Sequence, residues 1–171
     1  VVPRPRIEAI EAEIIYPQYT GLAPQKSVDG SVKAVAGSTV RYTAWTRPRV
    51  RSARFRFFQS GSKEPALSRD LPLEHQGSRT KLSGQFTVSA SGYYTFSLES
   101  LEGFVNDNPS RYRVRAVPDR IPQVRITKPL GTEECTPEGA VAVEGLVTDD
   151  WGISAVRFTY RIKEPAERDP G

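Results

Sequence analysis

Several residue types are scarce or missing in this chain, and each gap removes a class of protein. Its 171 residues include one Cys, one His and no Met. The single Cys, Cys135, cannot form a disulfide within the chain. The single His, His75, excludes any metal site that needs several histidines. No stretch approaches the ~18 consecutive apolar residues of a membrane-spanning helix.

Helix signals are also scarce, whereas strand signals are plentiful. The 14 Pro and 13 Gly recur along the chain, and no window of helical length keeps a 3.6-residue apolar period. Apolar and polar residues instead alternate with period 2, between short turn sequences such as Asp29-Gly30 and Ser91-Gly92. The pattern predicts an all-β sandwich with seven strands, named A to G in order, near 7–16, 39–45, 52–58, 70–75, 82–88, 92–99 and 110–117.

One motif in the middle of the chain indicates an Ig-like sandwich. Ig domains place a Tyr two residues before the second Cys, at the start of the sixth strand. Here Tyr94 takes the place of that corner tyrosine, and Phe96 stands where the Cys would be. Ala44 stands at the first Cys position, so an Ala–Phe pair replaces the disulfide that vertebrate-type domains have. The alternative is another β-sandwich with a Gly-Tyr turn.

An internal repeat predicts a second domain of the same kind. Segment 50–57 aligns with 153–160, and segment 40–44 aligns at the same offset with 143–147. Residues 1–118 are therefore expected to form one complete Ig-like domain. Residues 119–171 are expected to supply strands A, B and C of a second, incomplete Ig-like domain. Its remaining strands would come from a longer parent protein or from another chain.

Three short segments resemble tandem Ig-like modules of large bacterial membrane-anchored envelope proteins of unknown function. They are Tyr-Pro-Gln-Tyr-Thr-Gly at 16–21, Ala-Gly-Ser-Thr-Val at 36–40, and Thr-Asp-Asp-Trp-Gly-Ile at 148–153. The resemblance implies an extracytoplasmic location, other domains of the same protein as partners, and membrane association through the parent protein. The missing Met and signal segment agree with this, because they lead us to expect a piece of a longer protein or a mature form.

Charge is distributed unevenly and predicts a basic surface on the first domain. Residues 1–118 hold 17 basic and 10 acidic side chains, net +7, whereas 119–171 hold 7 and 10, net −3. In an Ig sandwich strands C, F and G share one sheet. Their outward residues would then include Arg54, Arg56, Tyr93, Arg111, Arg113 and Arg115.

Such an arginine face suits anionic partners, because guanidinium groups pair bidentately with phosphate and carboxylate. Acidic polysaccharides, anionic lipid head groups and acidic protein surfaces are candidates. Nucleic acid is not expected, because aromatic residues for base stacking are scarce. The alternative is a solvated face in a protein whose 18 Arg against 6 Lys reflect coding bias.

A calcium site is a further possibility at the junction between the domains. Asp119 lies in the expected linker, and Asp149 and Asp150 lie in the loop that would face it. Carboxylate oxygens are the ligands that calcium prefers. Asp is also an ordinary turn residue, which is the alternative.

Catalytic patterns are weak, so we expect no enzyme. His75 lies in a turn-rich stretch, Cys135 has no His near it in sequence, and the Ser-x-x-Lys match at 60–63 opens no helix. The leading hypothesis is a structural or adhesion module that acts as a spacer and protein-interaction surface in a bacterial cell-envelope protein. The alternative is a binding domain for acidic polymers that uses the basic sheet face.

Overall fold

The computed structural model describes residues 3–131, 133–136 and 138–161. It divides the chain into two compact units, Val1–Arg120 and Ile121–Gly171. Both units are built from strands, and the helical structure among the described residues is one short 3-10 turn, η1 (Gln18–Thr20). The predicted all-β class is therefore confirmed. Among these residues no helix has the length and apolar character needed to cross a membrane.

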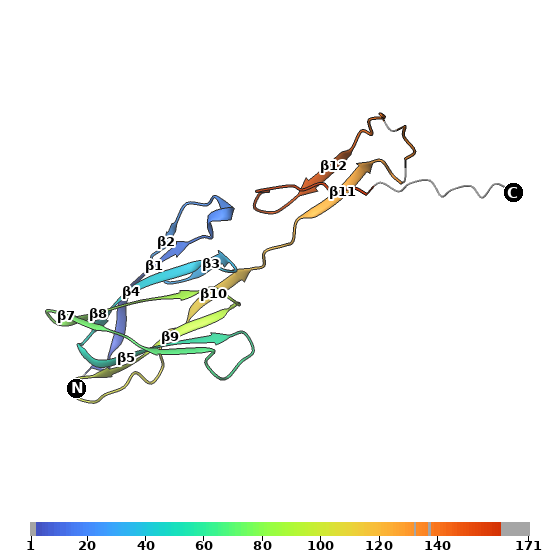
Figure 1. The fold of residues 1–171 in the computed structure, drawn as a ribbon. Helices are drawn as coiled ribbons and strands as arrows, with labels where there is room; N and C mark the ends of the chain where they lie inside the picture. The colour runs from blue at the N-terminus through green and yellow to red at the C-terminus, as the bar shows by residue number, and fades with distance from the viewer. Residues whose placement is uncertain (1–2, 132, 137, 162–171) are drawn as a thin grey trace. The chain divides into compact units, whose positions relative to one another are not determined.

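Unit 1 contains two five-stranded sheets (Figure 1). The first has the order β2 (Gln25–Ser27), β1 (Arg6–Ile15), β4 (Thr39–Arg47), β8 (Arg79–Thr87) and β7 (Leu73–Gln76). The second has the order β3 (Val32–Val35), β10 (Tyr112–Val117), β9 (Gly92–Ser100), β5 (Val50–Gln59) and β6 (Leu67–Asp70). Strand β3 pairs with β10 in parallel, whereas the other pairs are antiparallel.

The strand order of unit 1 agrees with the order in an Ig sandwich. Strands β1, β4, β8 and β7 stand in the order A-B-E-D, and β10, β9 and β5 stand in the order G-F-C. The sandwich class is shown by these two sheets. The Ig-like assignment remains an interpretation of their strand order.

The core lies between the two sheets and is rich in aromatic rings. Tyr42 on β4 stacks on Phe55 on β5 with their ring centroids 5.0 Å apart, and Phe86 on β8 lies 5.3 Å from Phe55. Ala44 and Phe96 are fully buried, and the Phe96 ring packs edge-on against Tyr42 at 5.4 Å. Strand alternation places these residues inside while the charged residues between them face water. The volume of the missing disulfide is therefore filled by apolar packing.

The predicted strand over 70–75 is wrong in its extent. The chain forms two strands there: β6 pairs with β5 in the second sheet, and β7 pairs with β8 in the first. The change of sheet occurs at Leu71-Pro72. Leu71 is buried and its N–H donates to the Ala53 carbonyl at 2.9 Å, whereas Pro72 has no N–H with which to continue a ladder.

Tyr94 also differs from the expected corner tyrosine in the group that it binds. Its ring is fully buried, and its hydroxyl donates to the carbonyl of Gly30 at 2.6 Å. A corner tyrosine bonds to the backbone a few residues upstream, whereas Gly30 lies 64 residues earlier. Gly30 belongs to the turn before β3 and has a φ of 76°. The hydrogen bond from Tyr94 therefore connects the central strand β9 with the turn that leads into the edge strand β3.

The described part of unit 2 contains one antiparallel pair, β11 (Gln123–Lys128) and β12 (Glu144–Thr148). These strands fall where strands A and B of the second domain are expected. Residues 153–160, expected as strand C, do not form a strand. In a sandwich this strand belongs to the opposite sheet, and the described part of unit 2 contains only the β11–β12 sheet to pair with. Apolar side chains such as Val156 and Phe158 are exposed there.

Candidate functional site: an arginine-rich sheet face

The outer surface of the second sheet in unit 1 carries the arginines that the sequence analysis singled out. On β5, Phe55 and Phe57 point into the core, so Arg54 and Arg56 point outward. Arg113 and Arg115 lie on the same surface of β10, and Arg111 directly precedes that strand. We call the set Arg54, Arg56, Tyr93, Arg111, Arg113 and Arg115 the basic face. Strand β9 lies between the two groups, with Arg113 opposite Tyr93 and Arg56 opposite Thr95.

The arginines of the basic face are not equivalent, because one of them is neutralised. Arg54 Nε donates to Asp70 Oδ1 on β6 at 2.6 Å. This ion pair raises the pKa of Arg54 and lowers the pKa of Asp70. The other arginines have no carboxylate within ion-pair distance in the described part of the chain: Arg56, Arg111, Arg113 and Arg115. The positive charge that can act on a partner therefore comes from these four.

Tyr93 holds one of these arginines in place. The guanidinium carbon of Arg111 lies 4.8 Å from the centroid of the Tyr93 ring. On β5, Phe58 stacks on the same ring, with centroids 5.1 Å apart and planes 12° apart. A cation over an exposed ring gains ~0.5–1 kcal/mol. The stack restricts the Arg111 side chain, so a bound anion would lose less conformational entropy on ordering it.

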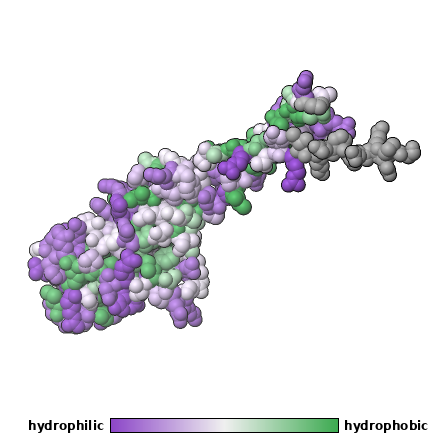
Figure 2. Space-filling model, in the orientation of Figure 1, coloured by the Kyte–Doolittle hydropathy of each residue, from purple (hydrophilic) through white to green (hydrophobic). Residues whose placement is uncertain are grey.

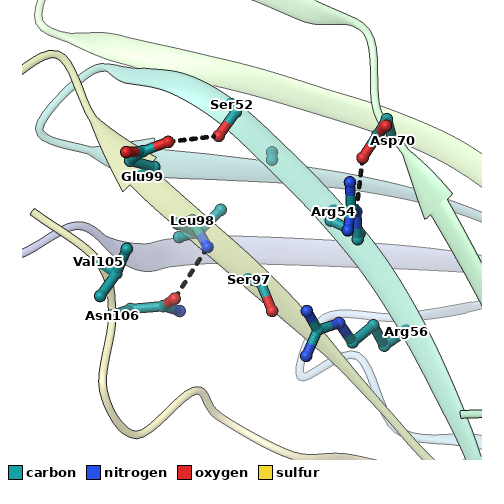
Figure 3. Close-up of a pocket in the computed structure, with 10 residues that line it drawn as sticks. Ser52, Arg54, Arg56, Asp70, Ser97, Leu98, Glu99, Val105 and Asn106 are labelled. Carbon is teal, nitrogen blue, oxygen red and sulfur yellow. Dashed lines mark hydrogen bonds and ion pairs between the residues drawn. The ribbon is translucent and has the colours of Figure 1, made fainter. Parts of the chain in front are cut away.

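A polar hollow of about 510 Å³ lies on the same sheet face and is lined by Arg54 and Arg56 of the basic face. It lies over β5, β9 and the loop after β9, and its polar lining includes Ser52, Arg54, Arg56, Asp70, Ser97, Glu99 and Asn106. Figure 3 shows Arg56 reaching from β5 toward Ser97 on β9. Asn106 is held by the backbone, because its Oδ1 accepts from Leu98 N at 2.8 Å and its Nδ2 donates to Phe96 O at 2.8 Å.

Glu99 is one of the two carboxylates that line the hollow. Glu99 is paired with Arg51 and accepts from the Ser52 hydroxyl at 3.2 Å. The hydrogen bond from Arg51 is the main reason why the pKa of Glu99 is lowered. Glu99 is therefore ionised near neutral pH. The hollow thus presents fixed acceptors at Asp70 and Glu99 and unpaired donors at Arg56.

The outer surface of the first sheet provides a contrast, because most of its basic side chains have a carboxylate partner. Glu8 pairs with Arg47 at 3.4 Å and with Arg79 at 2.7 Å. The remaining pairs on this surface are Glu13–Arg41 at 4.0 Å and Glu74–Lys81 at 3.3 Å. Exposed pairs stabilise the fold little, but they cancel the field that a partner would feel. Figure 2 shows polar residues interspersed with apolar ones over the visible surface of unit 1, so polarity alone does not distinguish a site.

The aspartates considered for calcium have other contacts. Asp119, in unit 1, accepts from the Tyr19 hydroxyl at 2.8 Å. Asp149, in unit 2, accepts from the N–H groups of Trp151 and Gly152 at 3.0 Å, which is the pattern of an ordinary Asx turn. Asp150 follows it in the same loop. Within the described residues of either unit, no three His, Cys, Asp or Glu side chains are grouped to hold a metal.

Several residues of this surface were not singled out by the sequence analysis. Phe58 is two residues after Arg56 on β5, so the period-2 alternation of the sequence already predicts that its side chain points outward. Lys33 on β3 lies opposite Arg115 and adds a further positive charge. Asp70 could not be found in this way, because its position beside Arg54 depends on the β5–β6 register. His75 and Cys135 are both exposed and lie outside this surface.

No protein-family model, curated protein or solved structure was found to match this chain.

Proposed function

We propose that unit 1 is a non-enzymatic binding module that holds an anionic polymer on its basic face. The observation that carries this proposal is the asymmetry between the two sheet surfaces. On the first sheet Arg41, Arg47, Arg79 and Lys81 each have a carboxylate partner. Four arginines of the second sheet have none within ion-pair distance in the described chain: Arg56, Arg111, Arg113 and Arg115. Unpaired arginines on one surface raise the local concentration of anions and strengthen their binding.

The chemistry of the face favours carboxylate or phosphate groups over stacked bases. Arg presents a planar fork of donors that matches both groups. Nucleic acid would also need an open aromatic surface, and the Tyr93 ring already packs against Phe58 and Arg111. A nucleic-acid partner is therefore not proposed.

A second candidate function is that of a spacer and protein-interaction module in a longer bacterial envelope protein. The repeat between segments 50–57 and 153–160 and the three motif resemblances support it, because they suggest tandem modules. In this setting the chain would be extracytoplasmic, and its parent would provide the membrane attachment. The two candidates are compatible, because a spacer can also carry a binding surface.

The anionic-polymer proposal is tested by charge reversal on one surface at a time. We expect Arg56→Glu with Arg113→Glu to weaken binding of polygalacturonate and of polyglutamate by about tenfold or more. Two unit charges ~4 Å apart interact by about 1 kcal/mol in water, so reversing one of them changes the interaction by roughly 2 kcal/mol before screening by salt. Affinity is measured by calorimetry in low salt and again at 0.15 M, where a Debye length of ~8 Å should weaken it.

The matched control is Arg41→Glu with Arg47→Glu, which makes the same change in net charge on the opposite surface. We expect the control to weaken binding by less than about threefold. Equal losses in the two double variants would show that net charge alone attracts the polymer. No measurable binding of either polymer to the unaltered chain at low salt would reject the proposal.

A further inference from the structure

The polar hollow on the basic face has a composition that simple anion binding does not explain. Two of its lining residues, Asp70 and Glu99, are paired carboxylates, which offer an anionic polymer hydrogen-bond acceptors and no net positive charge. Two others, Ser52 and Ser97, carry hydroxyls that can donate or accept. A ligand that fits this lining must bring both negative charge and hydrogen-bond donors.

Asp70 keeps free acceptor capacity although it is paired. Arg54 occupies Oδ1, and the side chain of Asp70 is 75% exposed. An ionised carboxylate offers about four lone-pair sites, so the second oxygen can accept from a ligand. The other side of the hollow supplies the opposite charge, because Arg56 points toward Ser97 and has no ion pair in the described chain.

We propose that the hollow is a saccharide subsite and that the anionic partner is a polysaccharide carrying carboxylate groups. The proposal rests on the function proposed for the basic face and names the chemical class of its ligand. A sugar carboxylate would pair with Arg56, while neighbouring ring hydroxyls would donate to Asp70 and Glu99. Bidentate pairing with Arg and charge-assisted bonds to carboxylates are the stronger hydrogen bonds available to such a ligand.

The dimensions of the face agree with a chain-like ligand. The hollow measures about 510 Å³, within the range of ~300–1,000 Å³ that small-molecule sites show. Strand β5 advances ~3.3 Å per residue, so the four steps from Ser52 to Arg56 cover roughly 13 Å. Arg113 lies beyond β9 from that strand, so a polymer leaving the hollow meets further positive charge.

A single substitution separates this inference from attraction by charge alone. Asp70→Asn removes one negative charge, so a purely electrostatic site would bind every polyanion more tightly. If Asp70 accepts sugar hydroxyls, the same substitution weakens oligogalacturonate binding, because an amide is a weaker acceptor. We expect a loss of about five- to tenfold for oligogalacturonate, and unchanged or tighter binding of polyglutamate, which has no hydroxyls.

Three controls complete the calorimetric titration of the full chain. Glu13→Gln makes the same charge change on the opposite surface and should not weaken oligogalacturonate binding. Ser97→Ala should weaken oligogalacturonate but not polyglutamate, and thermal melting confirms that each variant folds. Methyl-esterified oligogalacturonate keeps its ring hydroxyls and loses the charge of its carboxylates, so it should bind at least about tenfold more weakly.

The outcomes distinguish the two proposals. If Asp70→Asn tightens binding of both polyanions and Ser97→Ala has no effect, the saccharide subsite is rejected while the basic face stands as an anion site. If the unaltered chain binds neither polyanion, the function of the basic face fails and the subsite fails with it. Equal affinity for the esterified and free sugar would show that the carboxylate is not recognised.

Discussion

Removing one oxygen atom from Tyr94 tests how the edge of the second sheet is held. In Tyr94→Phe the ring keeps its contacts, including Tyr112 at 5.0 Å and Phe55 at 5.5 Å between centroids. The change removes only the 2.6 Å hydrogen bond to the Gly30 carbonyl. Because burial raises the pKa of Tyr94, this hydroxyl remains a donor across the usual pH range. An unsatisfied buried acceptor costs roughly 1–3 kcal/mol.

The expected effect is measurable by thermal melting. Taking ~2 kcal/mol, and about 4 °C per kcal/mol for a unit of this size, the midpoint should fall by about 8 °C. The neighbouring Tyr93→Phe is the matched control, because the Tyr93 hydroxyl has no hydrogen bond in the described structure and faces outward. A fall in Tyr93→Phe as large as that in Tyr94→Phe would refute the reasoning.

Two further predictions concern Gly92, on the same strand as Tyr94, and Asp29, which precedes Gly30. Gly92→Ala should destabilise unit 1 by about 1–3 kcal/mol in denaturant titration, because an added Cβ would lie 1.9 Å from the Phe58 carbonyl oxygen. The control is Gly131→Ala, which should be nearly neutral because an added Cβ there meets no atom within 4 Å. Hydrogen bonds from Ser31 and Ser27 lower the pKa of Asp29 from 3.8 to about 2. A depressed pKa stabilises the fold above the unfolded value and loses that effect as pH falls. The difference in melting midpoint between the unaltered chain and Asp29→Asn should therefore shrink between pH 4 and pH 2. A difference independent of pH would contradict this role.

Alternation predicted much of unit 1, because long strands with one wet surface leave a clear period. The predicted strand at 92–99 corresponds to β9, and its parity placed Phe96 inside and Tyr93 outside. The edge strands β2 and β3 have three and four residues, too few for a period to be recognised. The split of 70–75 depends on a change of sheet at Leu71-Pro72, which a local pattern does not record.

The basic face could be predicted only in outline. Parity and strand order placed its arginines on one surface, but which of them are neutralised depends on the register between strands. Arg54 is paired because Asp70 lies opposite it on β6. Tyr93 packs against Phe58 and lies under the Arg111 guanidinium, so it positions an arginine. These contacts join residues far apart in the sequence, so they follow from the register between strands and not from a local pattern.

The most direct test of the basic face is a titration of the full chain with oligogalacturonate, followed by NMR of the arginine side-chain Nε–H groups. We predict that the resonances of Arg56, Arg111 and Arg113 shift along one saturable binding curve. Those of Arg41 and Arg47, on the opposite surface, should stay in place. Shifts of similar size on both surfaces, or shifts confined to Arg41 and Arg47, would contradict the proposal that this face holds the anionic partner.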